Sequence, residues 1–402
     1  MSRDRPRSYP DLVKAPSGLD PCFPDLWDVD RTKELWDRTW WWWWWIFLLK
    51  DDDHPGRTRQ LMILWATRNC RDANINGTEW RNRIGIRHSR MDAPAAGGGE
   101  GERRVDFSGV TACWYFDGEK MIEPLILSAG EGRSSHFFSE NGTHHGRVGM
   151  DADGMRTAFE GWPDRAEIAA VGEHRGRKVA FHFTATPWTE PLWNIQPTGK
   201  DYFMQMGYAM RKYRGARVKG RINVSGAWSG DVEGTAYFQK VRIASPTSPW
   251  YWAMFHSADG SYFDYFMPHI GLPALRRGIG HRSGLDRGER ILSKGFHLWH
   301  GPSAREIVVK KIRMKKEWKG DQPIFILTGE EPGRSLRVVM ETYSRATWRV
   351  QQPFLPLLPT RLHYNEYPAI LREFELRDGA ERITLDDLGY SAGNCEHAWG
   401  IV

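Results

Sequence analysis

The sequence predicts an all-β protein, and three observations carry the prediction. Tryptophan is abundant, with 21 residues in 402, and stands beside 41 Gly and 23 Pro, a balance that favours strands, turns and a ring-lined interior. Short apolar runs with high β propensity recur along the chain, separated by turn residues. No helical periodicity of any length competes with them. Many short strands at such spacing are typical of a sandwich or a barrel.

The length and composition limit the class of protein. A chain of 402 residues has room for two domains or one large one. With 40% apolar and 26% charged residues, it is too hydrophobic to be disordered as a whole. Its four cysteines form no C-x-x-C pair, so neither a zinc knuckle nor a disulfide framework is indicated. The N-terminal residues lack the apolar core of a secretory signal, and we expect a cytoplasmic protein with free thiols.

The first predicted strand contains six consecutive tryptophans within residues 40–49. This apolar run of ten residues is too short to span a bilayer, which needs about 20 residues. In a strand, alternate rings face opposite sides, and residues 60–67 complete a long hairpin after a turn at 51–56. Such a strand must be covered twice, by a barrel interior on one side and by another element, a partner or lipid on the other. Because Trp favours the headgroup level of membranes, peripheral membrane contact is a hypothesis.

The rest of the chain is predicted to continue as short strands. They are expected at 110–116, 121–127, 167–171, 178–184, 216–225, 234–243, 250–256, 261–267, 295–299, 307–318, 324–328, 335–343 and 368–376, followed by a closing segment to residue 402. Asp259-Gly260 is the turn between two of them. Residues 276–290 mix Gly with Arg and have no apolar periodicity, so we place a domain boundary there.

The formal net charge of +6 comes partly from two basic clusters. The first holds Arg211, Lys212, Arg214, Arg217, Lys219 and Arg221, and the second holds Lys310, Lys311, Arg313, Lys315, Lys316 and Lys319. Such clusters suit anionic lipid headgroups or nucleic acid, but they are more often solvated strand faces. Only Trp318 accompanies the second cluster as a stacking ring, so we expect no nucleic-acid partner.

Motifs for cofactor chemistry are missing from the sequence. It has no P-loop, no H-E-x-x-H and no G-x-S-x-G, and it has no dinucleotide-binding glycine motif placed between a strand and a helix. The adjacent His144 and His145 would need a third ligand placed by the fold to hold a metal. We therefore expect neither a metal nor a cofactor.

The densest aromatic and polar grouping lies in residues 234–241, 250–256 and 261–269. On strands of period two, one face carries Trp250, Trp252, Met254 and His256, and another carries Tyr262, Asp264 and Phe266. An aromatic-walled barrel interior holding one carboxyl group and one imidazole would suit an apolar ligand. Burial would raise the pKa of Asp264 and make it a proton donor near neutral pH. The ordinary alternative is that these aromatics are core and that Asp264 satisfies a backbone amide.

These residues carry a family resemblance. The run Gly234-x-Ala-Tyr237, then Trp250-Tyr-Trp252, then Asp259-Gly-Ser-x-x-Asp-Tyr265, together with 393–400, resembles the lipocalin-like superfamily of the carotenoid 1,2-hydratases (hydroxyneurosporene synthases) and the AttH-like proteins. The resemblance covers the second half of the chain. It implies two lipocalin-like antiparallel β-barrels in tandem, which we place at 36–275 and 291–402. Residues 1–35 would be an N-terminal extension and residues 276–290 a linker.

The resemblance also implies roles for single residues. In the hydratases, a His-x-Trp motif and a later Tyr-x-Asp motif protonate an isoprenoid double bond and stabilise the carbocation that results. Tyr262-x-Asp264 matches the later element. Gln239 and Val241 stand where the family has His and Trp, and this difference from the family pattern argues against carotenoid hydration as the reaction. The predicted catalytic residues are Asp264, Tyr262 and His256. The predicted substrate-binding residues are Tyr237, Gln239, Trp250, Trp252, Tyr265 and His269.

A second grouping lies near the C-terminus. It contains Asn365, Glu366, Asn394, Glu396, His397 and Trp399. Alternation along a strand places Glu396 and His397 on opposite faces, so these two cannot form a dyad within that strand. We expect a structural role for this grouping.

Two functions follow from the sequence. The first is a cofactor-independent enzyme of hydratase, cyclase or isomerase type, acting by acid/base chemistry on an isoprenoid, terpenoid or lipid-like substrate in an aromatic-lined barrel pocket. The alternative is a non-catalytic lipocalin-like carrier of an apolar ligand, which docks on an anionic membrane surface or a partner through the Trp-rich hairpin. The substrate and the oligomeric state stay open.

Overall fold

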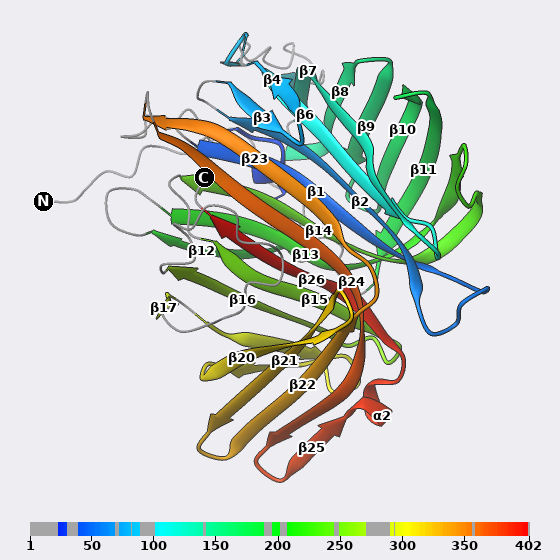
Figure 1. The fold of residues 1–402 in the computed structure, drawn as a ribbon. Helices are drawn as coiled ribbons and strands as arrows, with labels where there is room; N and C mark the ends of the chain where they lie inside the picture. Colours follow the sequence, from blue (N-terminus) through cyan, green and yellow to red (C-terminus); the bar gives the residue numbers. More distant parts are fainter. Residues whose placement is uncertain are drawn as a thin grey trace, which may run out of the picture.

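The computed structural model describes residues 23–29, 39–68, 72–81, 83–88, 101–139, 142–188, 195–201, 207–244, 249–270, 290–292, 294–355 and 358–400. Nearly all of them lie in antiparallel strands, which confirms the all-β prediction. Figure 1 shows two bodies of sheet, one built from the first part of the chain and one mainly from the last. The described helices are η1 (Pro24–Leu26) and the single turn α2 (Leu385–Leu388). Neither is long and apolar enough to cross a membrane.

The first body is a closed barrel of ten strands. These are β1 (Thr39–Lys50), β2 (Thr58–Arg68), β6 (Gly101–Phe116), β7 (Met121–Ser139), β8 (Gly142–Ala152), β9 (Met155–Gly161), β10 (Ala166–His174), β11 (Arg177–Pro187), β13 (Gly207–Val224) and β14 (Gly230–Ala244). They follow the order β11-β10-β9-β8-β7-β6-β2-β1-β14-β13, and pairing of β11 with β13 closes the ring. The short strands β5 (Ile86–His88) and β12 (Ile195–Asp201) attach to β6 and β13.

The second body is a curled sheet of fourteen strands. Its strands are β3 (Ala73–Ile75), β4 (Thr78–Trp80), β15 (Trp250–Ser257), β16 (Tyr262–Ile270), β17 (Arg290–Ile291), β18 (Phe296–His300), β19 (Arg305–Val309), β20 (Ile312–Lys319), β21 (Gln322–Glu331), β22 (Arg334–Thr342), β23 (Ala346–Leu355), β24 (Leu358–Asp378), β25 (Glu381–Thr384) and β26 (Ser391–Gly400). Its main path runs β19-β18-β16-β15-β26-β24-β22-β21-β20 and wraps around a second apolar core.

The change from one sheet to the other falls between β14 and β15. The strands β15 and β16 therefore lie in the second sheet, although the sequence analysis grouped them with the first barrel. The proposed linker at 276–290 lies, apart from Arg290, outside the described residues. The division into two domains stays a prediction.

Two tight hairpin turns are present, and the second of them is the predicted turn at Asp259-Gly260. Asn76 and Gly77, with φ of 47° and 85°, join β3 to β4, and Gly260, with φ of 85°, ends the turn between β15 and β16. In the first turn, positive φ at both central residues matches the right-handed twist of the paired strands, and Asn and Gly adopt it most readily. In the second turn, Gly260 is the last residue, and its N–H donates to the Ser257 carbonyl. The hairpin predicted for 40–49 and 60–67 is also present as β1 and β2, with Trp43 opposite Trp65.

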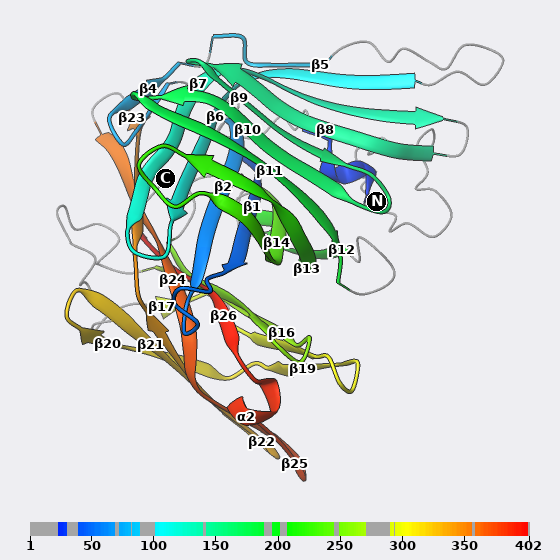
Figure 2. The same cartoon turned by 90° about the vertical axis from the view of Figure 1, so that its right-hand side faces the viewer.

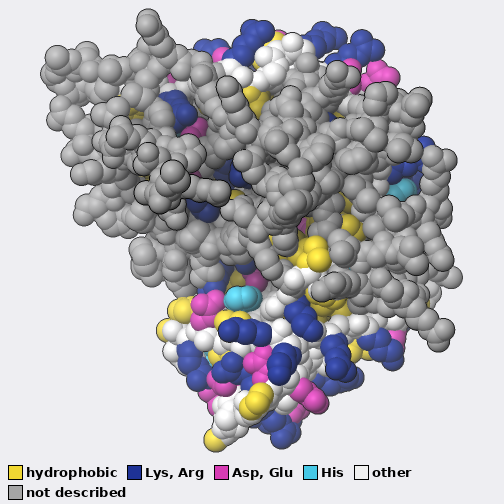
Figure 3. Space-filling model, turned by 90° about the vertical axis from the view of Figure 1, so that its left-hand side faces the viewer, with side chains coloured by type: hydrophobic (Ala, Val, Ile, Leu, Met, Phe, Trp, Pro, Cys, Tyr) yellow, Lys and Arg dark blue, Asp and Glu magenta, His cyan; other side chains and the backbone are white. Residues whose placement is uncertain are grey.

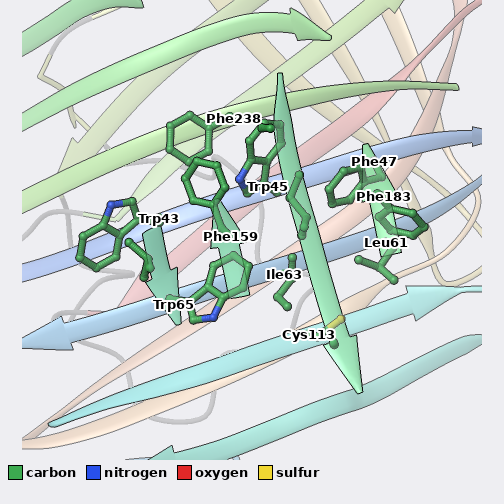
Figure 4. Close-up of a cluster of buried hydrophobic side chains, with 14 of the residues drawn as sticks. Trp43, Trp45, Phe47, Leu61, Ile63, Trp65, Cys113, Phe159, Phe183 and Phe238 are labelled. Carbon is green, nitrogen blue, oxygen red and sulfur yellow. The ribbon is translucent and has the colours of Figure 1, made fainter. Parts of the chain in front are cut away.

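The tryptophan strand β1 is covered on both faces by the same chain. Trp41, Trp43 and Trp45 belong to the core inside the barrel. There Trp45 packs against Phe159 and Phe238 (Figure 4). Trp40 and Trp44 point outward and pack against the second sheet. Since these five rings are at most 7% exposed, they form no lipid-facing surface. Membrane contact stays a prediction and would need another part of the protein.

Large side chains of the described residues pack inside the barrel. Besides its own aromatic side chains, it takes up the segment around η1, which lies by the barrel in Figure 2. Trp27 is 1% exposed, and the Trp43 indole donates a hydrogen bond to the Leu26 carbonyl at 2.5 Å. The Ser134 hydroxyl donates to the Trp27 carbonyl at 2.6 Å. These side chains occupy barrel interior in the part of the chain that the structure describes, and a ligand pocket inside a barrel stays a prediction.

The second basic cluster is largely a solvated strand face. On β20, side chains alternate between buried or half-buried and exposed, and Lys315 and Lys319 form ion pairs with Glu317 and Glu341. Figure 3 shows acidic and basic side chains interleaved on the lower part of the molecule. The ordinary interpretation of this cluster agrees with the structure.

The two-sided covering of β1 gives a stability prediction. We expect Trp45→Ala, in the barrel, and Trp44→Ala, on the outer face, each to lower the free energy of unfolding by about 3–5 kcal/mol, since each leaves a large cavity. Urea denaturation measures both. The control Val171→Ala, at a side chain that is 57% exposed, should change the free energy of unfolding by less than about 0.5 kcal/mol. A loss as small as the control's for either Trp variant would mean that its ring is not core.

Candidate functional site

Most of the predicted site residues meet between the barrel and the second sheet. We call this region the inter-sheet layer. From the barrel it takes Lys212, Arg214, Thr235, Tyr237 and Gln239, and from the second sheet it takes Trp250, Trp252, Met254, His256, Tyr262 and Asp264, together with Glu366, Asn394 and Glu396. The outer face of one sheet covers one face of the other, so these polar groups are shielded from water.

The layer on the second sheet is ordered in three cross-strand rows. His256 pairs with Tyr262 and Ala392, Met254 with Asp264 and Asn394, and Trp252 with Phe266 and Glu396. Paired residues of an antiparallel sheet share a face, and rows two residues apart are about 7 Å apart. The row that contains Asp264 therefore lies about 7 Å from the row of His256, and the row that contains Glu396 lies about 7 Å further along the strand.

A cleft of about 990 Å³ opens at the first row. Its lining includes His256, Thr235 and Ala392 of the layer, together with Trp188 after β11 and Tyr390 before β26. A volume of this size suits a small-molecule ligand. The approach to the layer from solvent is thus between the two sheets and not through the barrel.

His256 is a neutral and fixed imidazole on this cleft. Its Nε2 lies 2.7 Å from the Arg214 carbonyl, which can only accept, so Nε2 carries the hydrogen. Its Nδ1 lies 2.7 Å from the Thr235 hydroxyl and accepts from it. Burial lowers the pKa of His256 to about 4. His256 therefore serves to orient groups and not as a charged acid at neutral pH.

Asp264 is an ionised carboxylate. Its Oδ2 accepts hydrogen bonds from Lys212 Nζ at 2.5 Å and from the Tyr262 hydroxyl at 2.6 Å. Burial alone would raise its pKa, but the Lys212 charge and the hydrogen bonds from Lys212 and Tyr262 outweigh burial and lower the pKa below its usual value. The prediction that Asp264 is a buried proton donor near neutral pH is wrong, because its lysine partner holds it in the charged form.

Tyr262 keeps its proton beside this carboxylate. Burial, and then the charge of Asp264, raise the pKa of Tyr262 far above its usual value. The ring of Tyr262 lies 5.8 Å from that of His256 and 6.1 Å from that of Tyr237. Tyr237 donates to the Gln239 amide oxygen at 3.1 Å and packs on Trp252 at 5.5 Å. Ring contacts therefore continue from His256 at the cleft through Tyr262, which bonds Asp264, and through Tyr237 to the indole of Trp252.

Two predicted binding residues are not in the layer. Tyr265 and His269 lie on the opposite face of β16, because side chains alternate along a strand. Tyr265 is fully buried in the core of the second sheet. His269 packs on Tyr251, with 5.0 Å between ring centres, and lies near His397.

Lys212 is a site residue that the sequence does not reveal. In the sequence it is one member of a basic cluster, and no local pattern distinguishes it from its neighbours. Its role depends on β13 facing β16 across the layer, a contact between residues 52 positions apart. Only the packing of the two sheets brings Lys212 and Asp264 together.

A pair of carboxyl groups closes the inner end of the layer. Glu366 and Glu396 are cross-strand partners, and the Tyr364 hydroxyl contacts Glu366 Oε1 and, at 2.7 Å, Glu396 Oε1. The Trp250 indole donates to Glu396 Oε2 at 2.8 Å, and the Asn394 amide donates to Glu366 Oε2. Within the described part of the chain, neither carboxyl forms an ion pair.

Burial beside a second carboxyl favours the protonated form of this pair. The Tyr364 hydroxyl donates toward an oxygen of each carboxyl and so brings the two groups together. Burial raises the pKa of Glu396 to about 7. Burial and the neighbouring Glu396 raise the pKa of Glu366 well above its usual value. The structural role expected for this grouping stays a prediction. The sequence does not indicate that these two carboxyls pair, because they are 30 residues apart in the chain.

Metal ligation has no candidate in the part of the chain that the structure describes. Three or more His, Cys, Asp or Glu side chains do not converge there in a way that would hold an ion. The described thiols, Cys113 and Cys395, are both buried and unpaired.

Comparison with known proteins gives an overall likeness only. No family model and no curated protein matches the sequence. Solved structures that resemble it include an AttH candidate from Nitrosomonas europaea, with a TM-score of 0.48, 12% identity, and coverage of 96% of this chain and 98% of that one. Kievitone hydratase from Nectria haematococca has a TM-score of 0.38 and 8% identity, with 98% of both chains covered. At these values no residue role is transferred.

The carboxyl pair predicts a pH-dependent stability. The pKa of Glu396 is higher folded than unfolded, so the folded state binds the extra proton, and this stabilisation is complete below about pH 4.5 and is lost as the pH rises through 7. We expect the free energy of unfolding of the wild type to fall by about 2–3 kcal/mol more than that of Glu396→Gln between pH 5 and pH 8. Urea denaturation at each pH measures this.

A matched control for this experiment is Glu373→Gln, an exposed residue on the same strand as Glu366. It should keep the wild-type dependence on pH. Equal slopes for Glu396→Gln and the wild type would show that Glu396 holds no proton in this range.

Proposed function

We propose that this protein is an enzyme that transfers protons on an apolar substrate, isoprenoid or otherwise lipid-like, in the inter-sheet layer. The observation that carries the proposal is the buried array of Lys212, Asp264 and Tyr262, which adjoins His256 at the floor of the cleft. Perturbed titratable groups beside a cleft are typical of active sites. The reaction class is addition or elimination of water across a double bond, or double-bond isomerisation.

In this proposal Asp264 is the base and Tyr262 carries the proton to it. Tyr262 takes a proton from substrate carbon or from water on its hydroxyl oxygen, while its own proton passes to the Asp264 carboxylate. Lys212 keeps Asp264 ionised until that moment. The reverse movement returns a proton to the substrate. A positioned acid/base group of this kind contributes about 10²–10⁴-fold in rate.

The aromatic residues of the layer would supply binding and charge stabilisation. Tyr237 and Trp252 present ring faces beside Tyr262, and a ring face attracts positive charge that develops on a substrate. His256 would offer its ring face to the substrate at the entrance, because both of its ring nitrogens are already bonded to Arg214 and Thr235. The carrier alternative requires the same layer to bind a ligand without any transfer of protons.

The first test measures proton transfer directly. Purified protein is incubated in D₂O with a panel of isoprenoid alkenes and alcohols, and mass spectrometry detects deuterium uptake or addition of water. We expect Asp264→Asn to lower the rate by at least about 100-fold while binding stays intact, since the base is lost and the shape is kept.

The control for that test is Tyr265→Phe, next in the chain but on the opposite face of β16. It should react at the wild-type rate. Binding by the wild type with neither deuterium uptake nor hydration would favour the carrier, and full activity of Asp264→Asn would remove Asp264 from the mechanism.

A second test uses the pH dependence of the reaction. The Lys212 charge lowers the pKa of Asp264, so Lys212→Met should raise that pKa. A base works only when ionised, and the acidic limb of the pH–rate profile should therefore move to higher pH in this variant. An unchanged acidic limb would show that Asp264 does not act as the base.

A further inference from the structure

The first basic cluster divides into paired and unpaired residues. Four of its six members bind carboxylates. These ion pairs are Arg211 with Asp25 at 3.2 Å, Lys212 with Asp264 at 2.5 Å, Arg214 with Glu306 at 2.7 Å and Arg221 with Asp231 at 3.3 Å. The other two, Arg217 and Lys219, form no ion pair with any described residue. Both line the cleft.

The backbone explains why these two cations face the cleft. The register of β13 against β14 shifts between Tyr213 and Ala216. After this bulge Ala216 and Val218 point into the barrel, and Arg217 and Lys219 are exposed on its outer face. Side chains two residues apart on one face lie about 7 Å apart, a spacing at which both can contact one anionic group.

The acidic residues that line the cleft are mostly occupied. Asp51 binds Arg59 at 2.7 Å, and Glu233 binds Lys50 and lies opposite Lys219 on β14. Asp52 is exposed on the same lining, which also carries the three cations Arg57, Arg217 and Lys219. The free charge in the cleft is therefore positive.

The cleft also has an aromatic side. Tyr390 is 46% exposed and lines it, and Val171 is the only other large hydrophobic side chain exposed in the described part of the chain. Trp188 packs on His256 with 4.6 Å between ring centres. Apolar surface thus runs from the rim to the imidazole at the floor.

We infer that the cleft binds an amphipathic molecule whose carboxylate or phosphate group contacts Arg217 and Lys219 and whose apolar chain lies on Tyr390 and Trp188 toward His256. The inference rests on the proposed function in one respect, that this molecule would be the substrate. Arg gives a planar pair of donors and Lys a point charge, and both bind carboxylate and phosphate oxygens.

The test compares probes that differ only in the head group. Farnesol, farnesoic acid and farnesyl phosphate are titrated into the full-length protein by calorimetry, at low and at high salt. We expect at least one anionic probe to bind at least 10-fold more tightly than farnesol, with the difference reduced at high salt. Arg217→Ala/Lys219→Ala should remove this preference and leave the affinity for farnesol unchanged.

The matched control is Arg221→Ala. Arg221 is exposed on the same strand, but it pairs with Asp231 and is absent from the cleft lining, so this variant should keep the preference. Equal binding of all three probes, no binding of any, or the same loss in Arg221→Ala would overturn the inference. A preference for only one of the two anions supports it and tells carboxylate from phosphate.

Failure of this inference is separable from failure of the proposed function. The binding assay needs no turnover, and Asp264→Asn should bind the anionic probes as the wild type does. Anion preference without deuterium uptake on any probe would support the site and refute the enzyme. Deuterium uptake without anion preference would support the enzyme and refute the site.

Discussion

The structure depends on covering a strand that is apolar on both faces. Trp43 and Trp45 of β1 fill the barrel, whereas Trp40 and Trp44 need a second apolar surface. The second sheet supplies that surface, so the barrel and the sheet are joined by the burial of large rings, which is worth far more per residue than surface polar contacts. This junction creates the dry layer in which the polar site residues lie.

Charges buried in that layer are stabilised by partners from the opposite sheet. Lys212 comes from the barrel and Asp264 from the second sheet, and removing either would leave an unpaired charge away from water. At the inner end, Glu366 and Glu396 form no ion pair with a described cation, and burial raises the pKa of both carboxyls. The same layer therefore keeps one carboxyl ionised and holds a proton on another pair, a contrast of the kind that acid/base catalysis uses.

The cleft connects this layer to solvent. The position of each β13 cation relative to the cleft matches whether it forms an ion pair. Residues that face the second sheet, such as Lys212 and Arg214, are paired with its carboxylates. Arg217 and Lys219 line the cleft and form no ion pair with a described carboxylate of the second sheet. The junction thus separates cations that are paired across the two sheets from cations that face the cleft.

The sequence by itself determined the all-β class, the β1–β2 hairpin, the Asp259-Gly260 turn and the shared face of Tyr262 and Asp264, because these depend on local propensity and on a side-chain period of two. Only the tertiary structure decided which rings pack inside the barrel, that Tyr265 and His269 face away, and that Asp264 is ionised by Lys212. It also paired Glu366 with Glu396. These features depend on contacts between strands distant in the chain, and no local pattern encodes which charge will be buried beside which.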